Sequence, residues 1–231
     1  MKPNLILLHG ALGSKLYFKA LKELLKINFN VFDLDFEGHG EREMEEEEFS
    51  IPLFSDNLME FLFEQGIEKT HVFGYSMGGY VALDTATEIP EMIDKIVTYG
   101  TKFNWSPAIA AKEVKMLNPA VIEEKLPEFV ARLVELHPAN DWKVNMIMTA
   151  NLMQELGQNY GFDDAMLKTI ENHVTLGWGT ADKMVTELES KNVSEQLPNG
   201  SFHSLEGQPH PIENVNLNVL VNYIESSIFK A

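Results

Sequence analysis

The chain is 231 residues long, which suits one large domain or two small ones. Hydrophobic residues make up 45% of the chain and charged residues 23%, the balance of a folded globular protein. Cysteine is absent from the sequence, which excludes a disulfide scaffold, a thiolate zinc site, an iron–sulfur cluster and a cysteine nucleophile. The formal net charge of −17 repels phosphate backbones and anionic lipid headgroups, so we expect neither nucleic acid nor a membrane surface as a partner.

The apolar runs in the chain are short. None reaches the roughly 18 apolar residues of a membrane-spanning helix. Near the N-terminus only residues 5–8 are consecutively apolar, whereas a secretory signal needs about 7–15 such residues and a small-residue cleavage site. We therefore expect a cytoplasmic protein without a membrane span.

Six short, mainly apolar runs recur along the chain, and glycine follows each within two residues. They cover residues 5–8, 31–36, 71–73, 96–99, 174–176 and 201–205. Runs of this length that stop near glycine are typical of buried parallel strands. Apolar residues at helical spacing occupy segments between and after them, at 16–25, 53–63, 77–88 and 214–228. The alternation predicts an α/β fold, a mostly parallel sheet with helices on both faces.

Residues 101–170 break this alternation. They contain no convincing strand but several segments of helical period. In residues 126–136 the apolar side chains share one helical face, and residues 142–156 are rich in methionine. We predict that residues 101–170 form a helical lid inserted in a core built from residues 1–100 and 171–231.

One segment of the chain has a biased, acidic composition. Residues 41–48 contain six glutamates in eight positions. Such a run predicts a solvated loop whose charges repel one another. The alternative is a role in excluding anionic substrates.

The clearest chemical signal is Gly-Tyr-Ser-Met-Gly at residues 74–78, directly after a predicted strand and before a predicted helix. In this context G-x-S-x-G forms a strained strand-to-helix turn that lifts the serine oxygen above the sheet. The helix that follows directs its first backbone N–H groups toward developing negative charge. We predict that Ser76 is a nucleophile.

A serine nucleophile needs a histidine base, which comes after it in this arrangement. His210 lies between the last predicted strand and the last predicted helix, which is the expected position. His203 lies within the last strand and is the alternative. The other five histidines precede the serine, fall in the insertion or open a strand: His9, His39, His71, His137 and His173.

The base in turn needs an acid to orient it. Asp182 follows the strand that begins near residue 173, so it lies at the same sheet edge as Ser76. The loop at residues 101–104 follows the preceding strand and contains no carboxylate, and Asp163 falls in the insertion. Asp182 is therefore the predicted acid.

Acyl transfer also requires donors for the oxyanion. His-Gly-Ala-Leu-Gly at residues 9–13 follows the first strand and reaches the same edge. We predict that the backbone N–H groups of Ala11 and Met77 form the oxyanion hole.

These motifs, together with the Asp-Phe-Glu-Gly-His-Gly segment at residues 35–40, resemble a compact serine hydrolase of the α/β-hydrolase superfamily. The resemblance covers essentially the whole chain and implies six parallel strands. It departs from the common pattern at the acid loop, Gly-Thr-Ala-Asp at residues 179–182, and at the base, which prolines flank. Neither departure removes a catalytic group.

The resemblance implies that Ser76, His210 and Asp182 act as a triad through an acyl-enzyme, with no metal or cofactor. For the substrate pocket we name Leu12, Trp105 and Met146. Other apolar residues of the insertion, namely Phe129, Trp142, Met148 and Met153, could equally form the core of its helices. Because the net charge of −17 disfavours anionic substrates such as acyl-CoA, we predict a neutral carboxylic ester of short to medium length.

Other uses of the same residues stay open. The loop at residues 9–14 resembles that of the menaquinone-pathway synthase, a lyase, but Tyr80 stands where that family commonly has arginine. A thioesterase is a second enzymatic alternative, and a non-catalytic ligand binder that keeps the triad is a third. Serine at position 76 argues against haloalkane dehalogenases and epoxide hydrolases, which use aspartate there. The sequence does not fix the oligomeric state.

Overall fold

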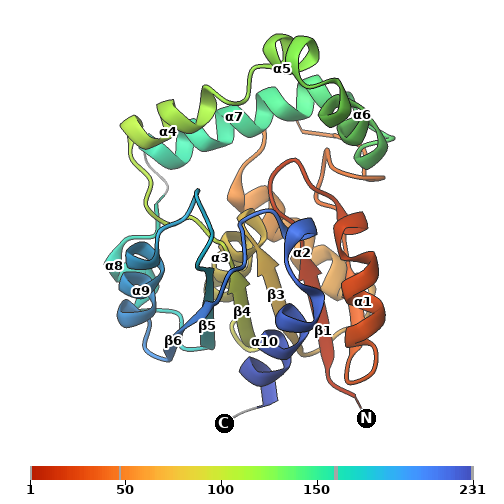
Figure 1. The fold of residues 1–231 in the computed structure, drawn as a ribbon. Helices are drawn as coiled ribbons and strands as arrows, with labels where there is room; N and C mark the ends of the chain where they lie inside the picture. Colours follow the sequence, from red (N-terminus) through yellow and green to blue (C-terminus); the bar gives the residue numbers. More distant parts are fainter. Residues whose placement is uncertain (1, 47, 159–160, 230–231) are drawn as a thin grey trace.

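The computed structural model describes residues 2–46, 48–158 and 161–229. Its centre is a six-stranded sheet in which every neighbouring pair is parallel, in the order β2-β1-β3-β4-β5-β6. The strands are β1 (Asn4–Leu8), β2 (Asn30–Asp33), β3 (Thr70–Tyr75), β4 (Ile93–Tyr99), β5 (His173–Gly179) and β6 (Gly200–Leu205). The predicted parallel sheet flanked by helices is confirmed (Figure 1).

Helices cover both faces of the sheet because alternate side chains of each strand point to opposite faces. In β1, Ile6 and Leu8 pack in one core and Leu5 and Leu7 in the other, and all four are fully buried. The first core includes residues from α2 (Ile51–Glu64), α3 (Met77–Glu88) and α9 (Glu187–Gln196). The second includes residues from the short 3₁₀ helix Lys15–Phe18, from α1 (Lys19–Leu25) and from α10 (Leu217–Phe229).

A set of helices lies between β4 and β5, within the predicted insertion. They are α4 (Pro107–Val114), α5 (Pro119–Lys125), α6 (Pro127–Leu136), α7 (Trp142–Gln158) and α8 (Asp164–Leu167). In Figure 1, α4 to α7 form a layer above the carboxyl ends of the strands. The helices α4 and α7 approach closely at Gly157, where an added Cβ would lie 2.5 Å from Cβ of Ala110. Within the described ranges, no helix is long and apolar enough to cross a membrane.

Strand β2 (Asn30–Asp33) is shorter than the predicted run at residues 31–36, because the backbone N–H groups of Phe36 and Glu37 donate to the side chains of His9 (3.2 Å) and Asn57 (2.8 Å) and not to a neighbouring strand. The carboxylate of Asp35 accepts hydrogen bonds from the backbone N–H groups of Lys15 (2.8 Å) and Glu41 (3.1 Å). An added Cβ at Gly40 would lie 2.1 Å from this carboxylate, and Gly40 has a φ of 59°. Residues 35–40 therefore form a turn that the Asp35 carboxylate holds in place.

The acidic segment at residues 41–48 begins beside this turn. The buried carboxylate of Glu37 accepts hydrogen bonds from the backbone N–H groups of Glu45 (3.0 Å) and Glu46 (2.6 Å). Glu41 pairs with Lys15 at 2.7 Å, and Glu47 lies outside the described residues. The middle of the segment is thus held by a buried carboxylate, which differs from the prediction of a fully solvated loop.

Candidate active site

Ser76 joins β3 to α3 in a strained backbone conformation, with φ 51° and ψ −116°. Few residues other than glycine adopt positive φ, and such strain persists only where the surroundings enforce it. An added Cβ at Gly74 would lie 2.4 Å from the Gly79 Cα, and one at Gly78 would lie 2.3 Å from the Leu8 carbonyl oxygen. This is the geometry expected of the predicted nucleophile turn.

The end of β4 holds the turn in place. The Ser76 N–H donates to the Tyr99 carbonyl at 2.9 Å, and the Thr101 hydroxyl donates to the Ser76 carbonyl at 3.0 Å. Both backbone polar groups of the strained residue therefore have partners, which leaves its side chain as its free polar group. The Thr101 hydroxyl also leaves no room for a side chain at position 79, since a Cβ added to Gly79 would lie 2.1 Å from it.

Asp182 and His210 form a hydrogen bond of 2.8 Å between the carboxylate Oδ2 and the imidazole Nδ1. Their side chains are 0% and 8% exposed, respectively. Asp182 Oδ1 accepts from the backbone N–H groups of Met184 (2.7 Å) and Val185 (2.9 Å). Because a carboxylate only accepts, Nδ1 of His210 carries the proton and Nε2 is left as the acceptor.

Burial alone would raise the pKa of Asp182. The hydrogen bond and charge of His210, with the N–H groups of Val185 and Met184, outweigh burial and hold this pKa below its usual value. The carboxylate is therefore ionised at neutral pH, as an orienting acid must be.

The same imidazole lies beside the serine turn. Its ring centroid is 5.6 Å from that of Tyr75, the residue immediately before Ser76. Gly100 borders the pair, since an added Cβ there would lie 3.1 Å from His210 Nδ1 and 3.5 Å from Asp182 Oδ2. The structure thus brings all three predicted triad residues to one sheet edge.

Groups that no sequence motif indicated hold the His210 loop against the Asp182 loop. The Tyr99 hydroxyl donates to the Pro209 carbonyl at 2.6 Å. The Ala181 N–H donates to the Gln208 carbonyl at 3.0 Å, and the Thr180 hydroxyl accepts from the Gly207 N–H at 2.7 Å. These contacts fix the distance between base and acid.

The alternative candidates lie elsewhere. His203 is exposed on β6, and its ring stacks on Tyr223 of α10 with centroids 5.4 Å apart. Asp163 caps α8 by accepting from the N–H groups of Ala165 and Met166. Neither of these side chains joins the Asp182–His210 pair.

The residues that carry the two predicted oxyanion donors line the same space as Ser76. Ala11, Met77 and Ser76 all line one cavity, and neither predicted N–H donates a hydrogen bond to another described residue. The loop of Ala11 packs directly on the serine, since an added Cβ at Gly10 would lie 3.0 Å from the Ser76 Cβ. Two backbone donors are therefore available beside the serine.

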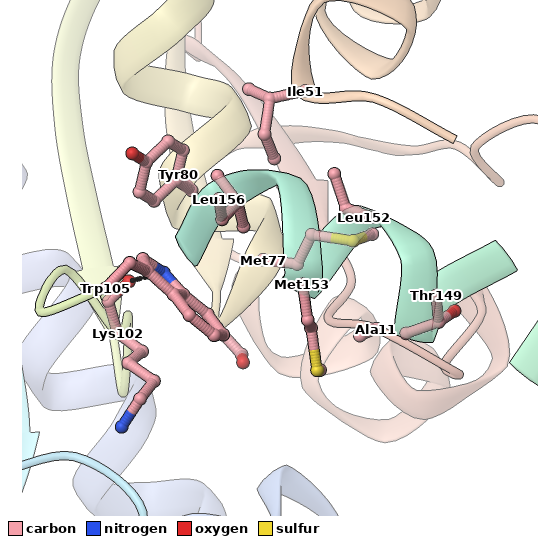
Figure 2. A pocket seen from close by; sticks show the side chains of 11 residues that line it. Ala11, Ile51, Met77, Tyr80, Lys102, Trp105, Thr149, Leu152, Met153 and Leu156 are labelled. Carbon is pink, nitrogen blue, oxygen red and sulfur yellow. Dashed lines mark hydrogen bonds between the residues drawn. The ribbon is translucent and has the colours of Figure 1, made fainter. Parts of the chain in front are cut away.

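This cavity has a volume of about 50 Å³ and is mainly apolar (Figure 2). Its lining comes from Ala11, Ile51, Ser76, Met77, Tyr80, Lys102, Trp105, Thr149, Leu152, Met153 and Leu156. Figure 2 shows Leu152, Met153 and Leu156 of α7 grouped around it with Tyr80 and Trp105. The insertion therefore supplies much of the wall.

Of the three predicted pocket residues, only Trp105 lines this cavity. Met146 is fully buried in a separate apolar cluster with Ile122, Leu133 and Trp142, and Leu12 packs against that cluster. The methionine-rich helix α7 has more than one buried face, and its sequence did not distinguish the face that meets the cavity.

Lys102 is the charged member of the lining, and sequence reasoning did not single it out. Its ammonium lies 3.5 Å from a carboxylate oxygen of Glu113 and donates to the Met184 carbonyl at 3.0 Å. In Figure 2 this ammonium points away from the apolar side chains. The positive charge of Lys102 therefore already has partners within the protein. Among the described residues, no group of three or more His, Asp or Glu side chains is arranged to hold a metal ion.

Three histidines are buried beside the Ala11 loop, with ring centroids of His39 at 5.1 Å from His9 and 5.6 Å from His137. His9 Nε2 accepts from the Phe36 N–H, so its Nδ1 is the donor to the Gly10 carbonyl. Burial lowers the pKa of all three, to about 4 for His9, and mutual repulsion lowers that of His39 further. These histidines are neutral at pH 7.

Acidification is expected to destabilise the fold through this cluster. Below the ordinary histidine pKa of about 6.5 the unfolded chain binds protons that the folded chain excludes, so stability falls with pH. The decline should run from about pH 6.5 to about pH 4, with His9 alone contributing on the order of 3 kcal/mol. Carboxylates such as Asp182, with its lowered pKa, lose their contribution to the free energy of unfolding only at lower pH. Urea unfolding between pH 7 and pH 4.5 measures this, and a free energy of unfolding that stays constant would contradict it.

A family model described as serine aminopeptidase, S33 (Hydrolase_4) matches residues 1–214. The chain belongs to this family. It is similar to the sn-1-specific diacylglycerol lipase ABHD11 of Xenopus laevis, with 26% identity over 67% of this chain and 52% of the relative. A putative esterase/lipase of Haemophilus influenzae is 19% identical over 90% of this chain and 77% of that protein. The chain thus spans about half the length of the first of these relatives.

Solved structures agree with this family membership at the level of the fold. A hydrolase from Pseudomonas aeruginosa superimposes with a TM-score of 0.80 at 17% identity, over 99% of this chain and 90% of that one. The 2-hydroxy-6-oxo-6-phenylhexa-2,4-dienoate hydrolase of Rhodococcus gives a TM-score of 0.78 at 24% identity, over 100% and 91%. This family member has the α/β-hydrolase fold and is similar to proteins named as esterases and lipases.

Proposed function

We propose that the protein hydrolyses carboxylic esters of small, neutral and mainly apolar compounds through an acyl-enzyme on Ser76. The observation that carries the proposal is the 2.8 Å bond between Asp182 and His210 beside a serine held at φ 51°. The bond fixes the tautomer in which Nε2 can accept a proton, and the strained turn presents the hydroxyl.

In the first step, Ser76 Oγ bonds to the acyl carbon while its proton passes to His210 Nε2. The carbonyl electron pair moves onto oxygen, where the N–H groups of Ala11 and Met77 donate to it. The ionised Asp182 stabilises the imidazolium formed. When the oxyanion collapses, the bond to the leaving oxygen breaks, and that oxygen takes the proton from Nε2.

In the second step, water replaces the alcohol. Nε2 of His210 takes a proton from the water as its oxygen bonds to the acyl carbon. The bond from this carbon to Ser76 Oγ then breaks, and Oγ regains its proton from Nε2. The products are a carboxylic acid and the free enzyme.

The lining of the cavity supports the substrate class. Apolar side chains dominate it, and the ammonium of Lys102 already has Glu113 and a carbonyl as partners. A volume of about 50 Å³ suits a short acyl group. The names of the Xenopus and Haemophilus relatives refer to lipase or esterase activity, which also favours an ester over the amide that the family description names.

Ile51 is expected to limit acyl length. A second cavity of about 220 Å³ lies next to the first, and both are lined by Ile51, Leu152 and Leu156. We expect Ile51→Ala to join them, so that the preferred p-nitrophenyl ester shifts from acetate or butyrate toward hexanoate or octanoate.

The shift is measured as kcat/KM across the ester series. The matched control is Ile67→Ala, because Ile67 is similarly buried but lines neither cavity. Both variants should lose about 2–4 kcal/mol of stability. An unchanged chain-length preference in Ile51→Ala would contradict the expectation that Ile51 separates the two cavities.

The proposed function is tested by turnover with three substrate types of matched acyl group: an aryl ester, a thioester and an anilide. The proposal expects saturable turnover of the ester with a burst of the phenol stoichiometric with enzyme, since an activated aryl ester acylates Ser76 faster than the acyl-enzyme is hydrolysed. Faster turnover of the thioester or the anilide would overturn the substrate class. Saturable binding of ester analogues without any turnover would instead support a ligand binder.

A further inference from the structure

We propose that His137, a residue of the helical insertion, is a positioning residue that orients the oxyanion donor Ala11. The inference rests on the proposed function. It gives the insertion a role in the reaction beyond covering the cavity.

His137 lies between α6 and α7, is 1% exposed, and contacts two core loops. Its Nδ1 is 3.0 Å from the Gly40 backbone nitrogen, which can only donate. Nδ1 is therefore the acceptor, and the neutral imidazole carries its proton on Nε2. Nε2 is 3.1 Å from the Leu12 carbonyl oxygen and donates to it.

Two rigid peptide units, Leu12–Gly13 and Gly10–Ala11, link the Leu12 carbonyl to the Ala11 N–H. The Leu12 carbonyl and the Gly13 N–H belong to one planar trans peptide, so they point in opposite directions. The Gly13 N–H donates to the Gly10 carbonyl at 3.1 Å. That carbonyl shares its peptide plane with the Ala11 N–H, which therefore points the other way. Ala11 lines the same cavity as Ser76.

The loop at residues 9–13 needs contacts from outside the loop to keep its conformation, because the backbone of Leu12 is strained. Its φ is 56°, a left-handed conformation that leucine rarely adopts. Besides its bond to His137, Leu12 packs its side chain against the insertion cluster of Ile122, Leu133, Trp142 and Met146. Both contacts come from the insertion, which thus keeps the loop in the conformation that directs the Ala11 N–H.

Two substitutions separate the contacts of His137. In His137→Gln the side-chain amide reaches the position of Nε2 and can donate to Leu12 while losing the acceptor for Gly40. In His137→Asn the side-chain oxygen replaces Nδ1 as the acceptor for Gly40, and the donor to Leu12 is lost. The pair therefore differs in the bond to the Ala11 loop.

The expected result is a fall in kcat of about tenfold to a hundredfold in His137→Asn with KM within about twofold, because a misaimed oxyanion donor acts on the transition state. The rate of Ser76 phosphonylation by a fluorophosphonate should fall in parallel. In His137→Gln, kcat should stay within about threefold of wild type.

Asn145→Ala is the control for a merely structural role. Asn145 of α7 is fully buried and donates to the Gly38 carbonyl at 2.7 Å, so it also ties the insertion to the core, but through a different loop. It should lower the midpoint of thermal unfolding and leave kcat within about twofold. All assays are run well below the unfolding midpoint of each variant.

The outcomes are distinct. Equal kcat values for His137→Asn and His137→Gln, or an equal loss of kcat in Asn145→Ala, would overturn the inference while wild-type turnover upholds the proposed function. Wild type without turnover or phosphonylation would overturn both. If His137→Asn does not fold, His137→Gln carries the test alone, and a loss of kcat beyond about tenfold in it would overturn the inference.

Discussion

Replacing Ser76 with alanine is expected to lower kcat for ester hydrolysis by about 10⁶-fold, because no acyl-enzyme can form. Residual catalysis would come only from the oxyanion donors and from binding. KM should change little, since the hydroxyl is a small part of a mainly apolar cavity. Alanine at this position keeps the side chain short, so the cavity and the strained turn are preserved.

The measurement is steady-state hydrolysis of p-nitrophenyl acetate above the buffer rate. The control is Ser204→Ala, an exposed serine of β6, which should keep full activity. If Ser76→Ala kept more than about a tenth of wild-type kcat, Ser76 would not be the nucleophile.

Replacing Asp182 with asparagine is expected to lower kcat by about 10⁴-fold. Oδ1 of Asp182 accepts from the N–H groups of Met184 and Val185, so the asparagine amide will direct its oxygen there. Its NH₂ group then faces His210 Nδ1, which must become the acceptor. The proton moves to Nε2, and this tautomer cannot take the proton of Ser76.

The check is kcat together with the rate of Ser76 phosphonylation, and both should fall. The matched control is Asp163→Asn, the same chemical change at a carboxylate that caps α8 by accepting two backbone N–H groups. Its kcat should equal that of wild type. Wild-type kcat in Asp182→Asn would remove the acid from the proposed triad.

Much of the fold could be predicted because its signals are local. Buried parallel strands show as short apolar runs, and the serine motif is informative because a strand precedes it and a helix follows it. Hydrophobic periodicity does not indicate helix α9, because its sequence is polar and its buried residues include Glu189 and Ser190. A readable signal was present in the capping box of Thr186 and Glu189.

The parts that could not be predicted depend on contacts between distant segments. The end of β2 is set by hydrogen bonds from the Phe36 and Glu37 N–H groups to the side chains of His9 and Asn57, and no periodicity in the chain contains them. The cavity wall joins α2, α3 and α7, which is why its lining was largely unforeseen. His137 had no motif at all, since its partner Leu12 is 125 residues away.

The most direct test of the account is the intact mass of the folded protein after treatment with a fluorophosphonate, which requires no knowledge of the substrate. The account predicts one covalent adduct per chain on wild type and none on Ser76→Ala or His210→Ala. An unlabelled wild type, or equal labelling of Ser76→Ala, would contradict it.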